Sequence, residues 1–157
     1  MDNDSKPKPP NDRDLVEAAF LRRRAEEVRR ALEQERERQN REKSELLEDK
    51  RREAFREFLD RQFTEADRLR FKEMTRAAVR AGEFEVLILR FPSDYLDDGG
   101  RAINNSDRNW PIYLTGYAKS IYDAHETMTK PLGYRLTARI LSYPDGRIGD
   151  IGLFLSW

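Results

Sequence analysis

The apolar positions between residues 18 and 32 recur at alternating spacings of three and four residues. This is the spacing of the a and d positions of a coiled coil, here over about two heptads. The positions are Ala18, Leu21, Ala25, Val28 and Leu32. The pattern predicts a helix with one apolar stripe, and Asp12 or Asp14 can cap its start.

Residues 33–45 (EQERERQNREKSE) contain no apolar side chain. They form either a helix that is polar on every face or a charged linker. A helix is favoured, because no glycine or proline interrupts residues 11–81 and the charges alternate in sign. Pairs four residues apart, such as Glu37 and Arg41, each stabilise such a helix by ~0.2–0.5 kcal/mol.

A wide aromatic stripe follows, and it ends at a helix-capping signal. The stripe extends from Leu47 to Phe63. Thr64 and Asp67 then have the spacing of a capping box, with Asp in place of the usual Glu. Either a second helix begins at Thr64 and ends at Gly82, or Thr64 lies inside one continuous helix.

The second half of the chain alternates strand and helix patterns. Residues 83–91 are apolar on both faces after Glu85, which predicts a central strand. Pro111 suits the first turn of a helix. Residues 134–143 and 147–157 flank the turn signal Pro-Asp-Gly, so we expect them to pair as a hairpin.

Together these patterns predict an α+β protein with a long charged N-terminal helix, a possible coiled coil. A small three-stranded α/β domain follows, of order helix-strand-helix-strand-strand. All eight glycines lie at or beyond residue 82, which marks a change of architecture. We expect a disordered tail in residues 1–11, an extended helical region in 12–63 and the α/β domain in 64–157.

The charge composition narrows the function classes. Charged residues make up 38% of the chain, yet the formal net charge is zero. Two basic clusters, residues 22–24 with Arg29 and Arg30, and Lys50 with Arg51 and Arg52, could follow a nucleic-acid backbone, but interleaved acidic residues weaken their potential. The chain has no cysteine, so thiolate chemistry and disulfides are excluded. No apolar run approaches the ~20 residues of a membrane helix, so we expect a cytoplasmic protein with no membrane partner.

A polar stretch between the first strand and the next helix, residues 93–109, is the most promising binding segment. A polar loop of this length is uncommon unless it is functional or mobile, and we expect it to be mobile without a partner. Its oxygen donors do not have the spacing of a calcium-binding EF-hand. The residues proposed for partner binding are Asp94, Asp97, Asp98, Asn104, Asn105, Asp107, Trp110 and Trp157.

The sequence contains no recognisable set of catalytic residues, and we expect neither enzyme activity nor a cofactor. His125, the only histidine, falls on the apolar stripe of its helix, which favours a packed side chain over a general base. Glycine-rich phosphate loops and nucleophile elbows are absent from the sequence.

The sequence therefore favours a non-enzymatic interaction or adaptor protein, with nucleic-acid association as the alternative. Its helical region would form a homo-oligomer or provide reach, and its second domain would bind a protein partner. The last strand either completes the core or presents an edge to a partner strand, and completion of the core is favoured. The residues expected to mediate oligomerisation are Leu21, Val28, Leu32, Phe55, Phe58 and Leu59.

Overall fold

The computed structural model describes residues 12–157, with side chains from residue 17 onward. The tail predicted for residues 1–11 lies outside this range. The chain divides into two compact units, Met1–Arg51 and Arg52–Trp157. Each unit is described by itself.

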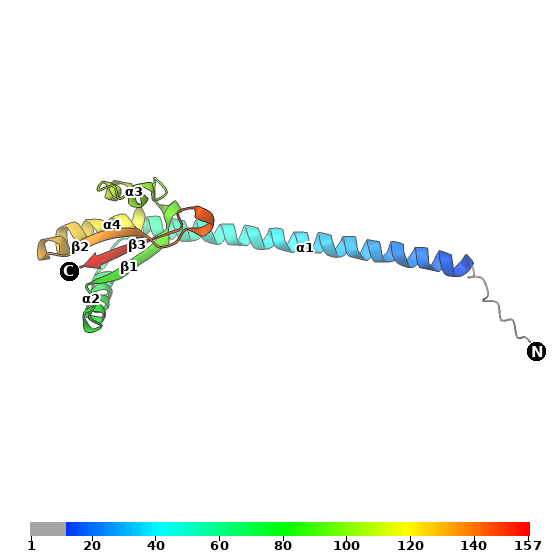
Figure 1. The fold of residues 1–157 in the computed structure, drawn as a ribbon, viewed down its shortest axis with the longest axis horizontal. Coiled ribbons are helices and arrows are strands. Elements are labelled where there is room, and N and C mark those ends of the chain that lie inside the picture. The colour runs from blue at the N-terminus through cyan, green and yellow to red at the C-terminus, as the bar shows by residue number, and fades with distance from the viewer. Residues whose placement is uncertain (1–11) are drawn as a thin grey trace, which may run out of the picture. The chain divides into compact units, whose positions relative to one another are not determined.

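Helix α1 (Asp12–Asp60) makes up the described part of the first unit and continues into the second (Figure 1). Residues 33–45 are helical throughout, so the prediction of a helix is confirmed and the charged linker is excluded. Nearly all side chains of this segment are exposed. It is stabilised by ion pairs along the helix surface, such as Arg29 with Glu33 at 3.2 Å.

Helix α2 (Glu65–Arg80) begins as a separate element after a short break in the chain. Thr64 is its N-cap: its hydroxyl accepts a hydrogen bond from the Asp67 amide at 3.3 Å. The Asp67 carboxylate accepts one from the Thr64 amide at 3.1 Å in return. The predicted capping box is thus confirmed, and the alternative of one continuous helix is wrong. Gly82 follows the helix in a left-handed conformation, with a φ of 79°.

Three antiparallel strands form the sheet: β1 (Glu85–Pro92), β2 (Arg135–Ile140) and β3 (Asp150–Ser156). Their order is β1-β3-β2, so β3 is the central strand. The hairpin of β2 and β3 is confirmed. The prediction that the strand in residues 83–91 is central is wrong, because β1 pairs only with β3 and lies at an edge. For the same reason, the last strand offers no free edge to a partner.

Short helices connect β1 to β2. They are the 3₁₀ helix η1 (Ser93–Tyr95), α3 (Arg101–Asn104), the 3₁₀ helix η2 (Trp110–Tyr113), α4 (Gly116–Ala124), a π-helical turn (His125–Thr129) and a 3₁₀ turn (Lys130–Leu132). Pro111 lies in η2, and α4 begins five residues after it. With α2, β1, α4, β2 and β3 as the main elements, the predicted α+β order is confirmed.

The core of the second unit lies between one face of the sheet and the helices. Ile151 and Leu153 of β3 and Ala118 of α4 have no exposed surface. Phe71 of α2 and Tyr117 of α4 belong to the same buried cluster. Within the described residues, no helix is both long enough and apolar enough to cross a membrane.

Candidate functional site

Two of the aspartates proposed for partner binding hold the local fold. The Asp98 carboxylate accepts hydrogen bonds from the amides of Gly100 and Ala102, at 2.9 and 2.7 Å, and so caps the start of α3. The Asp107 carboxylate accepts from the amide of Asn109 at 2.8 Å. These carboxylates therefore have structural partners within the chain.

The other polar residues of segment 93–109 that were proposed for partner binding lie in different surroundings. Asn104 accepts a hydrogen bond from the Tyr143 hydroxyl at 2.8 Å. Asp94, Asp97 and Asn105 are exposed. The segment is not a plain loop, because it contains helical turns and buried side chains, and backbone hydrogen bonds tie it to neighbouring segments. In residues 17–157, no group of three or more acidic or histidine side chains is arranged to hold a metal ion.

Both tryptophans are half-buried and contact tyrosines. Trp110 meets Tyr122 of α4 edge to face, with ring centroids 6.0 Å apart. Trp157 meets Tyr134 in the same way at 6.5 Å, and its amide donates to the Phe84 carbonyl at 3.2 Å. The structure thus distributes the proposed partner-binding residues over separate places and does not form one site from them.

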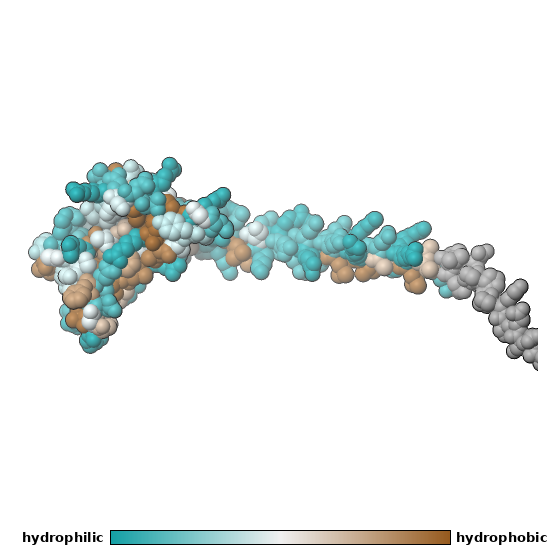
Figure 2. All heavy atoms as spheres, viewed as in Figure 1, coloured by the Kyte–Doolittle hydropathy of each residue, from teal (hydrophilic) through white to brown (hydrophobic). Residues whose placement is uncertain are grey.

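The residues expected to mediate oligomerisation divide into two groups. Leu21, Val28 and Leu32 of the first unit are 65, 52 and 65% exposed. Figure 2 shows apolar side chains along one side of α1 within an otherwise hydrophilic surface. In the first unit, these side chains form an uncovered apolar stripe.

The aromatic group, by contrast, packs inside the second unit. The ring centroids of Phe55 and Phe58 each lie 4.8 Å from the ring centroid of Tyr95, and that of Phe58 lies 5.3 Å from the ring centroid of Phe91. Leu59 stays partly accessible, at 39%. Phe55 and Phe58 therefore contribute to the fold of the second unit, and we leave both out of the proposed oligomer contact.

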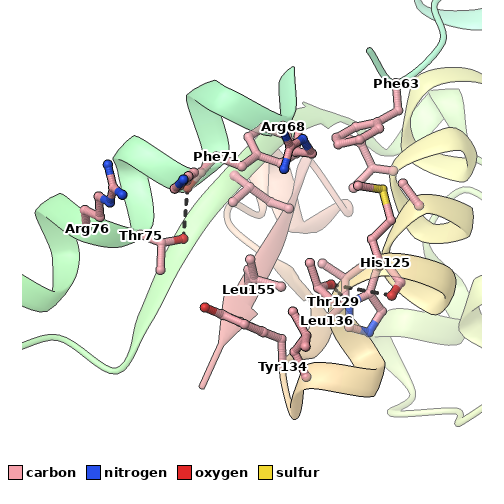
Figure 3. A pocket seen from close by; sticks show the side chains of 16 residues that line it. Phe63, Arg68, Phe71, Thr75, Arg76, His125, Thr129, Tyr134, Leu136 and Leu155 are labelled. Atoms are coloured by element: carbon pink, nitrogen blue, oxygen red, sulfur yellow. Dashed lines mark hydrogen bonds between the residues drawn. The ribbon is translucent and has the colours of Figure 1, made fainter. Parts of the chain in front are cut away.

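A pocket of about 390 Å³ opens in the second unit between α2, the helix formed by α4 and its π-helical turn, and the sheet (Figure 3). Its volume is in the range of small-ligand sites. Most of its wall is apolar. The lining residues that form the buried floor are Phe71, Ile88, Ile121 and Leu155.

Three cations of α2, four residues apart, lie on the pocket wall: Arg68, Lys72 and Arg76. Arg68 forms an ion pair with Glu65, and Arg76 forms one with Glu73 at 2.8 Å. Among the described residues, the side chain of Lys72 makes no ion pair or hydrogen bond. No lining residue is acidic. The cations are therefore not balanced by any carboxylate on the pocket wall.

His125 lies in the wall formed by the π-helical turn. It is 7% exposed, and its Nδ1 lies 2.6 Å from the hydroxyl oxygen of Thr129. Burial lowers the pKa of His125, although the charge of Glu126 opposes this shift. The ring is therefore neutral at pH 7. Glu126 pairs with Lys130 instead, so the histidine is packed and hydrogen-bonded, as its place on the apolar stripe suggested.

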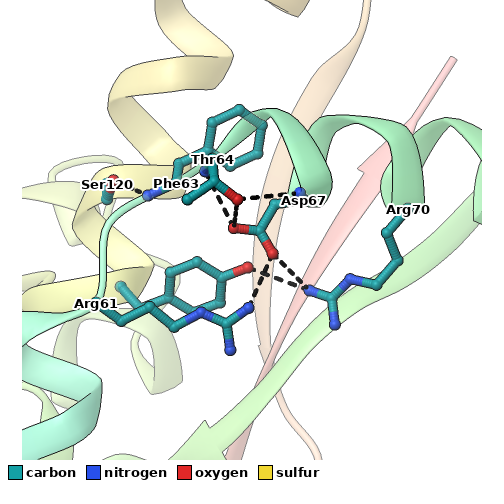
Figure 4. A network of polar contacts seen from close by, with 7 residues as sticks. Arg61, Phe63, Thr64, Asp67, Arg70 and Ser120 are labelled. Carbon is teal, nitrogen blue, oxygen red and sulfur yellow. Dashed lines mark hydrogen bonds and ion pairs between the residues drawn. The ribbon is translucent and has the colours of Figure 1, made fainter.

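A polar network beside this region links the end of α1 to α2 and α4 (Figure 4). Asp67 is buried, and Arg61 donates to its carboxylate at 2.8 Å. Arg70 donates to the Tyr117 hydroxyl at 3.1 Å, and the guanidinium of Arg61 lies 3.9 Å above the Tyr117 ring. The amide of Phe63 donates to the Ser120 hydroxyl at 2.7 Å.

The network sets the protonation of its two buried groups. Burial alone would raise the pKa of Asp67, but hydrogen bonds from Tyr117 and Thr64 and the charge of Arg61 lower it overall. Burial, with the neighbouring Asp67, raises the pKa of Tyr117 to about 12. Asp67 is therefore ionised and Tyr117 protonated at neutral pH, which is the state that the surrounding donors and acceptors favour.

The pocket was not predicted from the sequence, and of the network only the capping box of Thr64 and Asp67 was predicted. The spacing of Arg68, Lys72 and Arg76 by four residues was a visible signal for one side of the pocket. The other sides come from residues 121–136 and from β1 and β3.

Comparison of the chain with models of protein families, with curated proteins and with solved structures found no match in any of the three.

Proposed function

We propose that this protein is a non-enzymatic interaction protein that self-associates as a parallel coiled coil through the first part of α1. The observation that carries the proposal is the exposure of Leu21, Val28 and Leu32 at heptad spacing on an unbroken helix. An exposed apolar stripe of this kind favours association, because contact with the same stripe of a second copy removes its side chains from water.

The charges beside the stripe favour a parallel arrangement. With Leu21 and Val28 at d positions, every e position from residue 22 to residue 50 is basic. An antiparallel pair would place this row against itself, and like charges there repel. The row consists of Arg22, Arg29, Arg36, Lys43 and Lys50.

In a parallel pair in register, each g position faces the e position of the next heptad in the second copy. Glu17 then faces Arg22 of the second copy, and Glu45 faces Lys50. At two of these g–e pairs, both facing residues are basic. Arg24, Arg29 and Arg38, which take part in these two pairs, each already form an ion pair with a glutamate of their own helix, at 3.0, 3.2 and 2.9 Å. These internal pairs reduce the repulsion between the copies.

The same ion pairs weaken the alternative of nucleic-acid association, because Arg24 and Arg29 are partly neutralised.

For the second unit, we propose that a protein partner contacts exposed polar residues of segment 93–109. The proposed contacts are Asp94, Asp97 and Asn105, which are among the exposed polar residues of this segment.

Sedimentation velocity over a concentration series tests the self-association. We expect the full chain to form a dimer and the double variant Leu21→Glu, Val28→Glu to be a monomer. The control is Arg23→Gln with Arg30→Gln, which changes the net charge equally at f positions and should leave the dimer intact. A wild-type monomer at all concentrations would reject the coiled coil. Copurifying nucleic acid that is released by salt would favour the alternative.

A further inference from the structure

The pocket of the second unit combines an apolar floor with a cationic wall. Phe71, Ile88, Ile121 and Leu155 are all less than a tenth exposed, and they supply a surface that water solvates poorly. A strongly polar ligand such as a sugar or a nucleotide would leave its hydroxyl groups unpaired there. The floor therefore fits a hydrocarbon group.

The cationic wall formed by α2 adds a second requirement for the ligand, which is a negatively charged group. Arg68, Lys72 and Arg76 are exposed residues that also line the pocket, and no lining carboxylate opposes them. Glu65 and Glu73 compensate the two arginines, so Lys72 is the cation free to bind a ligand anion among the residues described. One ammonium group with three donors matches a compact anionic head.

We propose that this pocket binds a single-chain amphiphile with a carboxylate head, such as a medium-chain fatty acid. The carboxylate pairs with Lys72 at the exposed edge of α2. The hydrocarbon chain lies across the floor between Phe71 and Ile121 towards Leu136. The cavity of about 390 Å³ holds a ligand of this small size and excludes a two-chain lipid.

The wall opposite α2 is consistent with this orientation. His125 is neutral and already bonded to Thr129, so it offers no charge to a carboxylate. Met128 and Leu136 beside it are apolar and can contact the end of the chain. This wall is built on a π-helical turn, a rare element that is frequent at functional sites.

Calorimetric titration of the full chain with octanoate, decanoate and dodecanoate tests the apolar part of the proposal. Each added CH₂ that is buried should tighten binding by about four-fold until the pocket is full. The variant Leu21→Glu, Val28→Glu should bind the series like the wild type, since the stripe of α1 is not the site. No binding of any of the three, or loss of binding in that variant, would overturn the assignment.

The charged part is tested by Lys72→Glu. We expect dodecanoate to bind this variant at least about ten-fold more weakly. Lys119→Glu makes the same change of charge on α4 outside the pocket and should bind like the wild type. Dodecyltrimethylammonium, which has the same chain and a cationic head, should bind the wild type at least about ten-fold more weakly than dodecanoate. Equal binding in either comparison would reject Lys72 as the anion site.

Methyl NMR locates the bound chain independently of affinity. Dodecanoate should shift the methyl signals of Ile88 and Ile121, which line the pocket. Those of Ile112 and Ile148, which do not line it, should stay in place. Shifts confined to Ile112 and Ile148, or an unchanged spectrum at saturating dodecanoate, would show that the ligand does not enter this cavity.

Discussion

Gly116 lies directly against the backbone of Phe58, at the point where α4 begins beside the last turn of α1. A Cβ atom at Gly116 would lie 2.4 Å from the Phe58 carbonyl oxygen and 2.6 Å from the Cα of Leu59. The φ of Gly116 is also positive, at 47°. Close approach and backbone conformation both require glycine here, and together they fix α4 against α1 within the second unit.

Gly116→Ala should therefore destabilise the second unit strongly, by roughly 2–4 kcal/mol, because overpacking adds to backbone strain. Gly133→Ala is the matched control: its φ is 93°, but no atom lies within 4 Å of the added methyl group. We expect that control to cost about 1 kcal/mol. Urea unfolding of both variants measures the difference, and equal losses would show that the contact with Phe58 does not contribute.

Asp98 and Asp97 form a second matched pair, with different expected effects. Asp98→Ala removes the two hydrogen bonds that start α3 and should cost about 1 kcal/mol. Asp97 is exposed, so Asp97→Ala should change the stability by no more than about 0.5 kcal/mol. Chemical denaturation measures both.

Hydrogen exchange tests the order of the same segment. The amides of Leu96 and Asn104 donate to backbone carbonyls at 3.0 Å each. We now expect these amides to be protected in the free protein, contrary to the mobility predicted for residues 93–109 from the sequence. In Asp98→Ala, the amides of Gly100 and Ala102 should exchange faster. Fast exchange of the whole segment in the wild type would restore the earlier expectation.

Tyr117 makes the stability depend on alkaline pH. Its pKa is raised to about 12 in the folded chain and is about 10 when unfolded. Between these values the unfolded chain releases a proton that the folded chain keeps. The stability is therefore complete below pH ~10 and falls as the pH rises through the folded pKa, by about 1.4 kcal/mol at pH 11.

The free energy of unfolding between pH 8 and pH 11 measures this contribution. Tyr117→Phe should lower the stability at pH 8 and flatten its decline towards pH 11. Tyr143→Phe, at an exposed ring, should keep the wild-type slope. An unchanged slope in Tyr117→Phe would mean that this phenol does not cause the decline.

Deletion of residues 153–157 should unfold the second unit. It removes most of β3, the strand that joins β1 to β2, together with the completely buried Leu153. Each large apolar side chain lost costs ~1.5–3 kcal/mol. Loss of the near-ultraviolet circular dichroism signal, with much of the α1 helicity kept, is the expected result. A truncated chain that melts like the wild type would contradict it.

Several features could be predicted because their causes are local in the sequence. The capping box at Thr64 depends on two residues three positions apart, and the helix through residues 33–45 depends on propensity and the absence of breakers. The β2–β3 hairpin follows from a turn between adjacent strands. In each case, the deciding interactions lie within one or two turns of chain.

Tertiary structure decided the features that depend on pairing between distant segments. An apolar strand can be central or at an edge, and the pairing of β1 with β3 placed the last strand in the middle. The aromatic stripe of Phe55 and Phe58 could have bound a second copy, but the ring of Tyr95 covers it within the chain. The pocket joins α2 to residues more than 40 positions away. The periodicity of a sequence shows which side chains need burial, whereas only the packed chain determines what buries them.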